Sequence, residues 1–149
     1  MGQIIKIEGV IVTPLKIIEH PKGDLFHIMH TGDEGYKGFG EVYISTINFG
    51  DVKAWKKHFK MTSNFAVPFG KIKVVLVDLR EHSTSINEKS EFILSSDDYF
   101  RLTIPPGVWY GLKGLSENIN ILINFADIVH DPNEQINIDY NKSEIIYDW

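Results

Sequence analysis

The sequence predicts an all-β protein of the jelly-roll type, with residues 1–149 forming one domain. Short segments rich in Val, Ile, Phe and Tyr recur along the chain, separated by clusters of Gly, Pro, Asn, Asp and Ser. This pattern is typical of β-sandwiches and β-barrels. No window carries a sustained i, i+3, i+4, i+7 apolar stripe, so any helix is expected to be short. A chain of 149 residues has the usual length of a single domain.

The individual strands are predicted from apolar runs that end at turn residues. The first, Gln3–Val12, alternates between polar and apolar positions, and Pro14 and Pro21 bracket a short second strand. The segment Asn48–Asp51 has the composition of a turn and closes a long strand. The further strands expected are, in chain order, Asp24–His30, Gly38–Ile47, Val52–Phe59, Lys71–Leu79, Glu91–Leu94, Phe100–Ile104, Val108–Leu115 and Ile119–Ala126.

Composition narrows the classes of function. The formal net charge is −5, whereas nucleic-acid-binding proteins usually present a basic face, so we expect no nucleic-acid partner. No apolar run approaches the ~20 residues that cross a bilayer, and the N-terminus lacks the apolar core of a secretory signal, so we expect no membrane association. The chain has no cysteine, which excludes disulfides and thiolate chemistry. A cytoplasmic location is therefore expected.

Two features bear on ligands and on assembly. The densest basic cluster lies within Lys53–Lys60 and is compatible with a small anionic ligand in an otherwise acidic protein.

The N-terminal strand region is long enough to pair with a second copy of the chain, and exposed strand edges tend to be covered. We expect a homodimer, because this is the commonest closed symmetry.

The histidines do not form a metal-binding pattern. A metal-binding jelly roll often uses an HxH pair on one strand and a third histidine on a later strand. Here Lys56 stands where the first histidine of a pair with His58 would be, and Tyr110 stands where the third would be expected. A lone histidine does not build such a site. We predict that the protein uses no metal.

The strand Val52–Phe59 carries the most suggestive pair of titratable groups. Period-two alternation assigns its residues to two faces, with Val52, Ala54, Lys56 and His58 on one and Lys53, Trp55 and Lys57 on the other. If the first face lines the barrel, burial and nearby positive charge lower the pKa of Lys56 and make it a possible base. The alternative interpretation is a solvated basic face, and the pattern alone does not decide between them.

Four segments, in order, carry a family resemblance. They are VKAWKKHFKMT (Val52–Thr62), GKIKVVLVDLREHS (Gly70–Ser83), DDYFRLTIPPGVWYGLKGLSE (Asp97–Glu117), and HDPNE (His130–Glu134) with the final YDW (Tyr147–Trp149). Over Gly23–Trp149 the chain resembles the dTDP-4-dehydrorhamnose 3,5-epimerase family, the sugar-epimerase branch of the cupins.

The resemblance implies a cupin fold and a metal-free epimerisation of a nucleotide-linked 4-keto-6-deoxyhexose. In this family a base removes the proton next to the ketone, cationic or hydrogen-bonding groups stabilise the enolate, and an acid returns a proton to the opposite face. No cofactor is needed, because the ketone acidifies the neighbouring C–H bond. The resemblance also implies a role in deoxysugar or surface-polysaccharide biosynthesis.

Several of the family's functional positions carry different residues here. Lys56 occupies the place of the family's histidine base, with His58 two residues further on, and Tyr110 replaces a second histidine. Lys53 stands at an arginine position, as a cation without the bidentate fork. The remaining differences place Ser63 at the family's lysine, Ile123 or Asn124 at its tyrosine acid, and Lys22 and His27 at polar positions near the N-terminus.

Other side chains are candidates for holding the substrate. Arg101 is placed before the IPPG turn, and its guanidinium would suit a diphosphate. Trp109 is a candidate for stacking on a sugar or base, and Asn64 and Asn124 are candidates for hydrogen bonding within the pocket.

Three functions remain open at this point. The first is a divergent epimerase or isomerase with Lys56 or His58 as base and Tyr110 as acid. The second is a non-catalytic relative that binds a nucleotide sugar or scaffolds a glycan-assembly enzyme, and the third is a cupin with an unrelated small-molecule role. The first requires a base and a proton donor on opposite sides of the ligand, whereas a binder requires only a cavity and cations.

Overall fold

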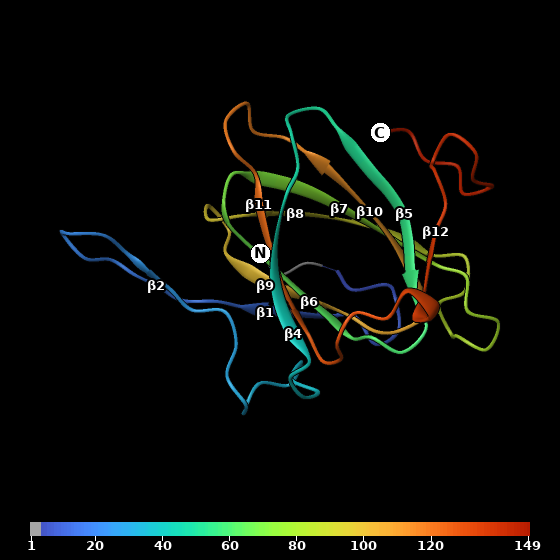
Figure 1. The fold of residues 1–149 in the computed structure, drawn as a ribbon, viewed down its shortest axis with the longest axis horizontal. Coiled ribbons are helices and arrows are strands. Elements are labelled where there is room, and N and C mark those ends of the chain that lie inside the picture. The colour runs from blue at the N-terminus through green and yellow to red at the C-terminus, as the bar shows by residue number, and fades with distance from the viewer. Residues whose placement is uncertain (1–3) are drawn as a thin grey trace.

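The computed structural model describes residues 4–149 and shows two packed antiparallel sheets (Figure 1). Sheet I has the strand order β1-β9-β6-β11-β4, and sheet II has the order β12-β5-β10-β7-β8. The strands are β1 (Ile11–Pro14), β2 (Ile17–Ile18), β3 (Leu25–Phe26), β4 (Glu41–Thr46), β5 (Val52–His58), β6 (Ser63–Phe69), β7 (Lys71–Asp78), β8 (Lys89–Ser95), β9 (Phe100–Ile104), β10 (Val108–Gly114), β11 (Ile121–Ala126) and β12 (Gln135–Asn137).

This arrangement confirms the predicted all-β jelly roll. Consecutive strands repeatedly cross from one sheet to the other, so that β5 and β6, and likewise β9 and β10, belong to different sheets. The one helical element is a short 3-10 turn, Pro132–Glu134, within the part of the chain that the structure describes. Residues 4–149 contain no helix with the length and apolar character that a membrane span requires.

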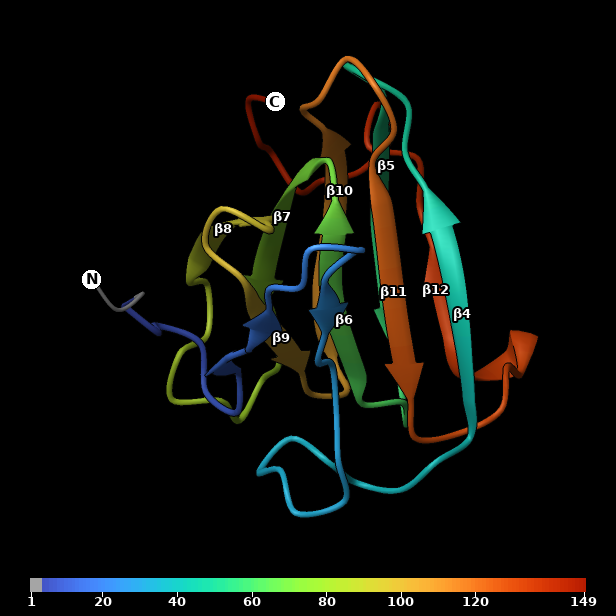
Figure 2. The same ribbon diagram turned by 90° about the vertical axis from the view of Figure 1, so that its left-hand side faces the viewer.

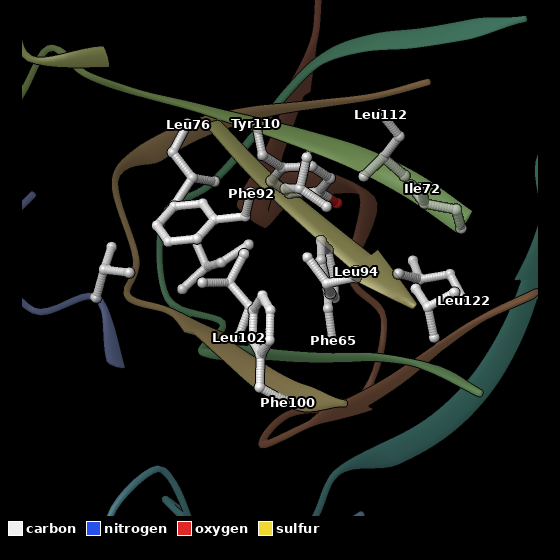
Figure 3. Close-up of a cluster of buried hydrophobic side chains, with 14 of the residues drawn as sticks. Phe65, Ile72, Leu76, Phe92, Leu94, Phe100, Leu102, Tyr110, Leu112 and Leu122 are labelled. Carbon is white, nitrogen blue, oxygen red and sulfur yellow. The ribbon is translucent and has the colours of Figure 1, made fainter. Parts of the chain in front are cut away.

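The core between the sheets fills one half of the sandwich (Figure 3). Phe65 from sheet I and Phe92 from sheet II lie in one continuous cluster of buried apolar side chains, together with Leu102 and Leu112. Tyr110 belongs to the same cluster (Figure 3). The edge strands on the other side are β4 in sheet I and β12 in sheet II (Figure 2).

The N-terminal prediction was only partly right. The strand expected over Gln3–Val12 begins at Ile11, while Gln3 lies outside the described residues. Ile7 and Val10 are buried without belonging to a strand, because the chain turns at Gly9, whose φ is +86°. A positive φ of this kind favours glycine.

Two strands were missed, and β6 has a clear physical reason. Every residue from Ser63 to Pro68 is buried, so the alternation that marks a half-buried strand is absent. The outer face of β6 is covered by the segment 28–36, since the Nδ2 of Asn64 donates to the carbonyl of Gly35 at 3.1 Å. The strand β12 is short and polar, and it is held by pairing with β5.

A β-bulge in β5 corrects the predicted facing of its residues. Tyr110 pairs with Lys56 and Gly111 pairs with Ala54, so Trp55 is an extra residue on β5. Such an insertion shifts the alternation by one. Lys53 therefore faces the interior with Lys56, whereas Ala54 faces outward against Gly111. The expectation that Lys53 shares a face with Trp55 was wrong.

The outer face of sheet II is covered by the last residues of the chain. Trp55 is 1% exposed and packs with Val75 and Trp109. Its ring centroid lies 5.3 Å from that of Trp149. A Cβ at Gly111 would lie 2.7 Å from the Trp149 ring, so this position has to be glycine for the two aromatic rings to stack over β5 and β10.

Arg101 joins the segment 28–36 to the outer face of sheet I. Its side chain is 0% exposed, and its guanidinium donates to the Ile28 carbonyl at 2.6 Å and to the Asp33 carboxylate at 2.9 Å. Its Nε donates to the Asn64 side chain at 3.2 Å. These partners make Arg101 a structural residue that holds a loop onto the sheet.

We predict that Arg101→Met destabilises the fold by about 3 kcal/mol, because it leaves Asp33 and Asn64 without their cationic partner in a buried site. Urea unfolding followed by tryptophan fluorescence measures the loss. The control is Lys37→Met, at an exposed position just after the segment 28–36. It should change stability by less than about 0.5 kcal/mol. Equal stabilities of the two variants would contradict this role.

Candidate active site

A cavity of about 450 Å³ lies between the sheets, next to the strands β4, β5 and β12. This volume is within the range of about 300–1,000 Å³ that is usual for small-molecule sites. Its apolar floor is formed by core residues, among them Phe65, Leu112 and Leu122. The polar side chains that line it are Tyr43, Ser45, Lys53, Lys56, Tyr110, Asn137 and Asp139.

Lys56 is half-buried on the cavity wall formed by sheet II. Burial lowers the pKa of its ammonium group, because desolvation disfavours the charged form. The carboxylate of Glu134 opposes this shift, and the neighbouring charge of Lys53 adds to it. The bulge at Trp55 thus presents to the cavity an amine that loses its proton more readily than an exposed lysine.

Lys53 reaches from β5 across to the facing sheet. Its Nζ donates to the carbonyl of Thr46 at 2.7 Å and lies 3.4 Å from the hydroxyl of Ser45. The side chain therefore links β5 of sheet II to β4 of sheet I beside the cavity, where its charge is available to an anionic ligand.

Tyr110 is the cross-strand partner of Lys56, on the neighbouring strand β10 of the same sheet. Burial raises the pKa of its phenol well above the ordinary value, and the nearby Tyr43 and Glu134 raise it further. The phenol is therefore protonated across the neutral range and acts as a hydrogen-bond donor. Its ring packs edge-on against Phe65 at a centroid distance of 5.2 Å, which fixes its position on the cavity floor.

His58 lies behind Tyr110 and does not line the cavity. Its Nε2 is 3.5 Å from the Tyr110 hydroxyl, and its Nδ1 forms a short hydrogen bond with the Glu134 carboxylate. Because an ionised carboxylate only accepts, Nδ1 carries the proton and Nε2 is left to face the phenol. Burial lowers the pKa of His58, and the contact with Glu134 offsets this only in part.

Glu134 is the buried residue at the end of the series of contacts that runs from Tyr110 through His58. Burial alone would raise the pKa of its carboxyl group, but hydrogen bonds from His58 and from the backbone amides of Lys60 and Met61 outweigh it and lower the pKa. The carboxylate is thus ionised at neutral pH and holds the imidazole in place. Tyr110, His58 and Glu134 form one connected polar network at the end of the apolar core.

Tyr43 faces the cavity from the opposite wall, on β4 of sheet I. Asn124, on the neighbouring strand β11, donates from its Nδ2 to the Tyr43 hydroxyl at 2.8 Å. Burial raises the pKa of Tyr43, while the hydrogen bond from Asn124 counters part of this effect. Asn124 itself is buried and does not line the cavity.

The other residues expected to bind substrate lie away from the cavity. Asn64 and Arg101 hydrogen-bond to each other on the outer face of sheet I, and Trp109 lies in the outer aromatic cluster of sheet II, with the Nζ of Lys57 5.0 Å from its ring. Lys22 and His27 belong to the β2–β3 hairpin segment, which projects from the sandwich (Figure 1). The structure thus brings together Lys53, Lys56 and Tyr110, with His58 and Asn124 directly behind the walls.

Several residues of the site were not singled out from the sequence, and three of them, Glu134, Asp139 and Tyr43, show why. Glu134 lies in the HDPNE segment, but only the fold shows that it contacts a histidine on β5. Asp139 follows the missed strand β12. Of these three, Tyr43 was the easiest to predict from the sequence, since alternation in the predicted strand Gly38–Ile47 places it on one face with Ser45.

The polar groups of the site are amine, phenol, imidazole and carboxylate. Within residues 4–149, His, Asp and Glu side chains do not gather in groups of three that could hold a metal ion. A lysine of lowered pKa beside phenols in a part-apolar cavity is suited to proton transfer. Phenol and ammonium groups are also suited to stabilising an oxyanion.

Comparison with known proteins finds a matching family model and related proteins. Residues 54–149 match the family model described as dTDP-4-dehydrorhamnose 3,5-epimerase. The chain is 29% identical over 148 residues to a probable low-salt glycan biosynthesis epimerase, Agl13, of Haloferax volcanii, covering 96% of this chain and 94% of that protein. It is 28% identical over 145 residues to the spore coat polysaccharide biosynthesis protein SpsL of Bacillus subtilis, covering 96% of each.

The fold of the chain is also similar to that of a solved structure. The dTDP sugar isomerase from Desulfovibrio desulfuricans superposes with a TM-score of 0.89 at 34% sequence identity, covering 93% of this chain and 88% of that chain. The resemblance read from the four sequence segments is confirmed. This chain belongs to the dTDP-4-dehydrorhamnose 3,5-epimerase family.

Proposed function

We propose that the protein is a nucleotide-sugar epimerase that acts on a nucleotide-linked 4-keto-6-deoxyhexose in the synthesis of a glycan or polysaccharide. Family membership supports the substrate class, and the relatives named for glycan and spore coat polysaccharide synthesis support the pathway. The observation that carries the proposal is Lys56, an amine of lowered pKa that faces a ligand-sized cavity beside a protonated phenol.

In the proposed reaction, Lys56 is the base. Its neutral amine removes the proton from the carbon next to the ketone, and the electron pair moves onto the ketone oxygen as an enolate. The O–H of Tyr110 turns from its 3.5 Å contact with His58 Nε2 to donate a hydrogen bond to that oxygen, and Lys53 supplies positive charge at the cavity edge. Donors placed where negative charge develops are an effective way to lower such a barrier.

His58 has a supporting role in this proposal and is not the base. Its Nδ1 is held by Glu134, and its Nε2 faces Tyr110 and not the cavity. The sequence left Lys56 and His58 as alternative bases, and the geometry favours Lys56. The hydroxyl of Tyr110 faces the unprotonated Nε2 of His58, and Glu134 holds that imidazole in place.

A non-catalytic nucleotide-sugar binder is the second candidate function. It is favoured by the replacement of the family's histidine base by Lys56, of its second histidine by Tyr110 and of its lysine by Ser63. The two candidates differ in one measurable property, which is removal of a carbon-bound proton from a bound keto sugar.

We predict that the wild-type protein incorporates solvent deuterium into dTDP-4-keto-6-deoxyglucose, as followed by NMR, and that Lys56→Met and Lys56→Arg both reduce the rate by at least about 100-fold. Arginine keeps the positive charge but stays protonated, so it cannot act as a base. Lys57→Met is the matched control, because Lys57 is the next residue and points outward over Trp109.

The outcomes of this experiment separate the candidate functions. Binding without exchange in the wild type would favour the non-catalytic binder. Full activity of Lys56→Arg would show that only the charge at this position matters, and it would contradict the assignment of the base.

We predict that the exchange rate rises with pH and that its midpoint lies below 10.5, the ordinary pKa of lysine. The neutral amine is the active form, and burial destabilises the ammonium form, so activity is lost as the pH falls below the lowered pKa. Rates measured across pH 6–11, an interval chosen to bracket the ordinary histidine and lysine values of about 6.5 and 10.4, would test this. A midpoint that disappears in His58→Gln would identify the imidazole as the base instead.

We also propose that the protein forms a homodimer. The projecting β2–β3 hairpin exposes Ile18 and Leu25 at about half of their surface, and the outer face of β4 exposes Val42 and Ile44. A dimer that covers these side chains would also bring Lys22 and His27 of the hairpin next to a second copy of the chain.

We predict that light scattering coupled to gel filtration gives twice the 17.1 kDa chain mass. Ile18→Glu combined with Leu25→Glu should shift the protein toward the monomer, because each substitution places a charge in the apolar contact. Glu19→Gln, in the same hairpin, is the control. A monomeric wild type at micromolar concentration would refute the dimer.

A further inference from the structure

The cavity contains two phenols, and they lie on opposite walls. Tyr110 belongs to sheet II, where it is paired with Lys56 on the neighbouring strand. Tyr43 belongs to β4, the edge strand of sheet I, and lines the same cavity. The two sheets face each other across the cavity, so a ligand placed between them has Lys56 and Tyr110 on one side and Tyr43 on the other.

Inversion at a carbon requires two groups on different sides of the ligand. One group removes the proton from the first face, and another returns a proton to the second face. Lys56 and Tyr110 project from adjacent strands of a single sheet and approach a ligand from the same wall. Tyr110 is therefore well placed to bind the ketone oxygen and poorly placed to protonate the face opposite Lys56.

The surroundings of Tyr43 leave its proton free for a ligand. Asn124 donates from Nδ2 to the Tyr43 oxygen at 2.8 Å, and its own Oδ1 accepts from the backbone N–H of Asn64 at 3.0 Å. This second contact fixes which way the Asn124 amide points. Since the phenol oxygen accepts from Asn124, its O–H is available to donate into the cavity. The same N–H of Asn124 can stabilise a phenolate after the proton has left.

We propose that Tyr43 is the catalytic acid of this site and that Asn124 is its positioning residue. This inference rests on the proposed epimerase function and assigns to Tyr43 the acid role that the sequence had suggested for Tyr110. Lys56 takes the C–H proton and becomes an ammonium ion while the enolate forms. The Tyr43 O–H bond then breaks as a new C–H bond forms on the opposite face, the ketone is restored, and Tyr43 is left as a phenolate.

The cycle closes without any further reactant. After the product leaves, the phenolate of Tyr43 takes a proton from water and the ammonium group of Lys56 returns one to water, so no net proton is consumed. Burial raises the pKa of Tyr43, so the resting phenol stays protonated at neutral pH. The phenolate is a transient form that Asn124 stabilises.

The two phenols can be distinguished by a matched pair of variants, Tyr43→Phe and Tyr110→Phe, assayed in D₂O with dTDP-4-keto-6-deoxyglucose. NMR measures two rates for each protein, namely deuterium entry into recovered substrate and formation of the epimer. Tyr43→Phe should lower epimer formation by about 100-fold or more, while Lys56 continues to exchange the substrate proton. Tyr110→Phe should lower both rates by a similar factor, because both require the enolate.

Two controls separate loss of chemistry from loss of fold or binding. Tyr36→Phe removes a hydroxyl from a tyrosine whose ring packs on Phe125, outside the cavity lining, and should leave both rates unchanged. Asn124→Leu should lower epimer formation more than exchange, and thermal melting shows whether it has folded.

Each possible outcome decides between specific claims. Wild-type epimer formation in Tyr43→Phe, or an equal loss of exchange and epimer formation in that variant, would overturn the role of Tyr43. Selective loss of epimer formation in Tyr110→Phe would assign the acid to Tyr110. Neither exchange nor epimer formation in the wild type would overturn the proposed function itself and this inference with it.

Discussion

The β-bulge at Trp55 is the constraint on which the rest of the site depends. A regular strand would place Lys53 and Lys56 on opposite faces of sheet II. The extra residue brings both lysines to the interior and turns the indole outward. The outward position is stabilised by a tilted ring contact with Trp149 and by packing on Val75. The aromatic cluster outside the sheet and the cationic wall inside it are therefore two consequences of a single local geometry.

The cavity combines polar side chains with a core that would otherwise exclude them. Each cavity-facing phenol has a partner from a neighbouring element, Asn124 for Tyr43 and the His58–Glu134 pair for Tyr110. Satisfied polar groups of this kind cost little when buried and hold the side chains in one orientation. Polar groups fixed in this way are preorganised for a bound ligand.

The sequence predicted the fold and candidate residues on one wall of the site. It did not predict the features that depend on tertiary contacts. The jelly roll followed from strand and turn composition, and alternation put Lys56 and His58 on one face without deciding whether that face lines the barrel. Lys53 was placed on the wrong face, because a bulge is not visible in the pattern of β5. The strand β6 was missed because the core buries one of its faces and the segment 28–36 covers the other. Arg101 looked like an exposed phosphate ligand, yet its partners come from a loop far away in the sequence.

The central claim is that a keto sugar binds between two walls, with an amine on one side and a phenol on the other. A crystal structure of the protein with a bound dTDP-linked keto sugar, or an unreactive analogue, tests it most directly. The account predicts that the sugar ring lies in the cavity, with Lys56 Nζ and the Tyr43 hydroxyl on opposite faces and each within about 3.5 Å of the reacting carbon. A sugar bound outside the cavity, or one with both groups on the same face of its ring, would contradict it.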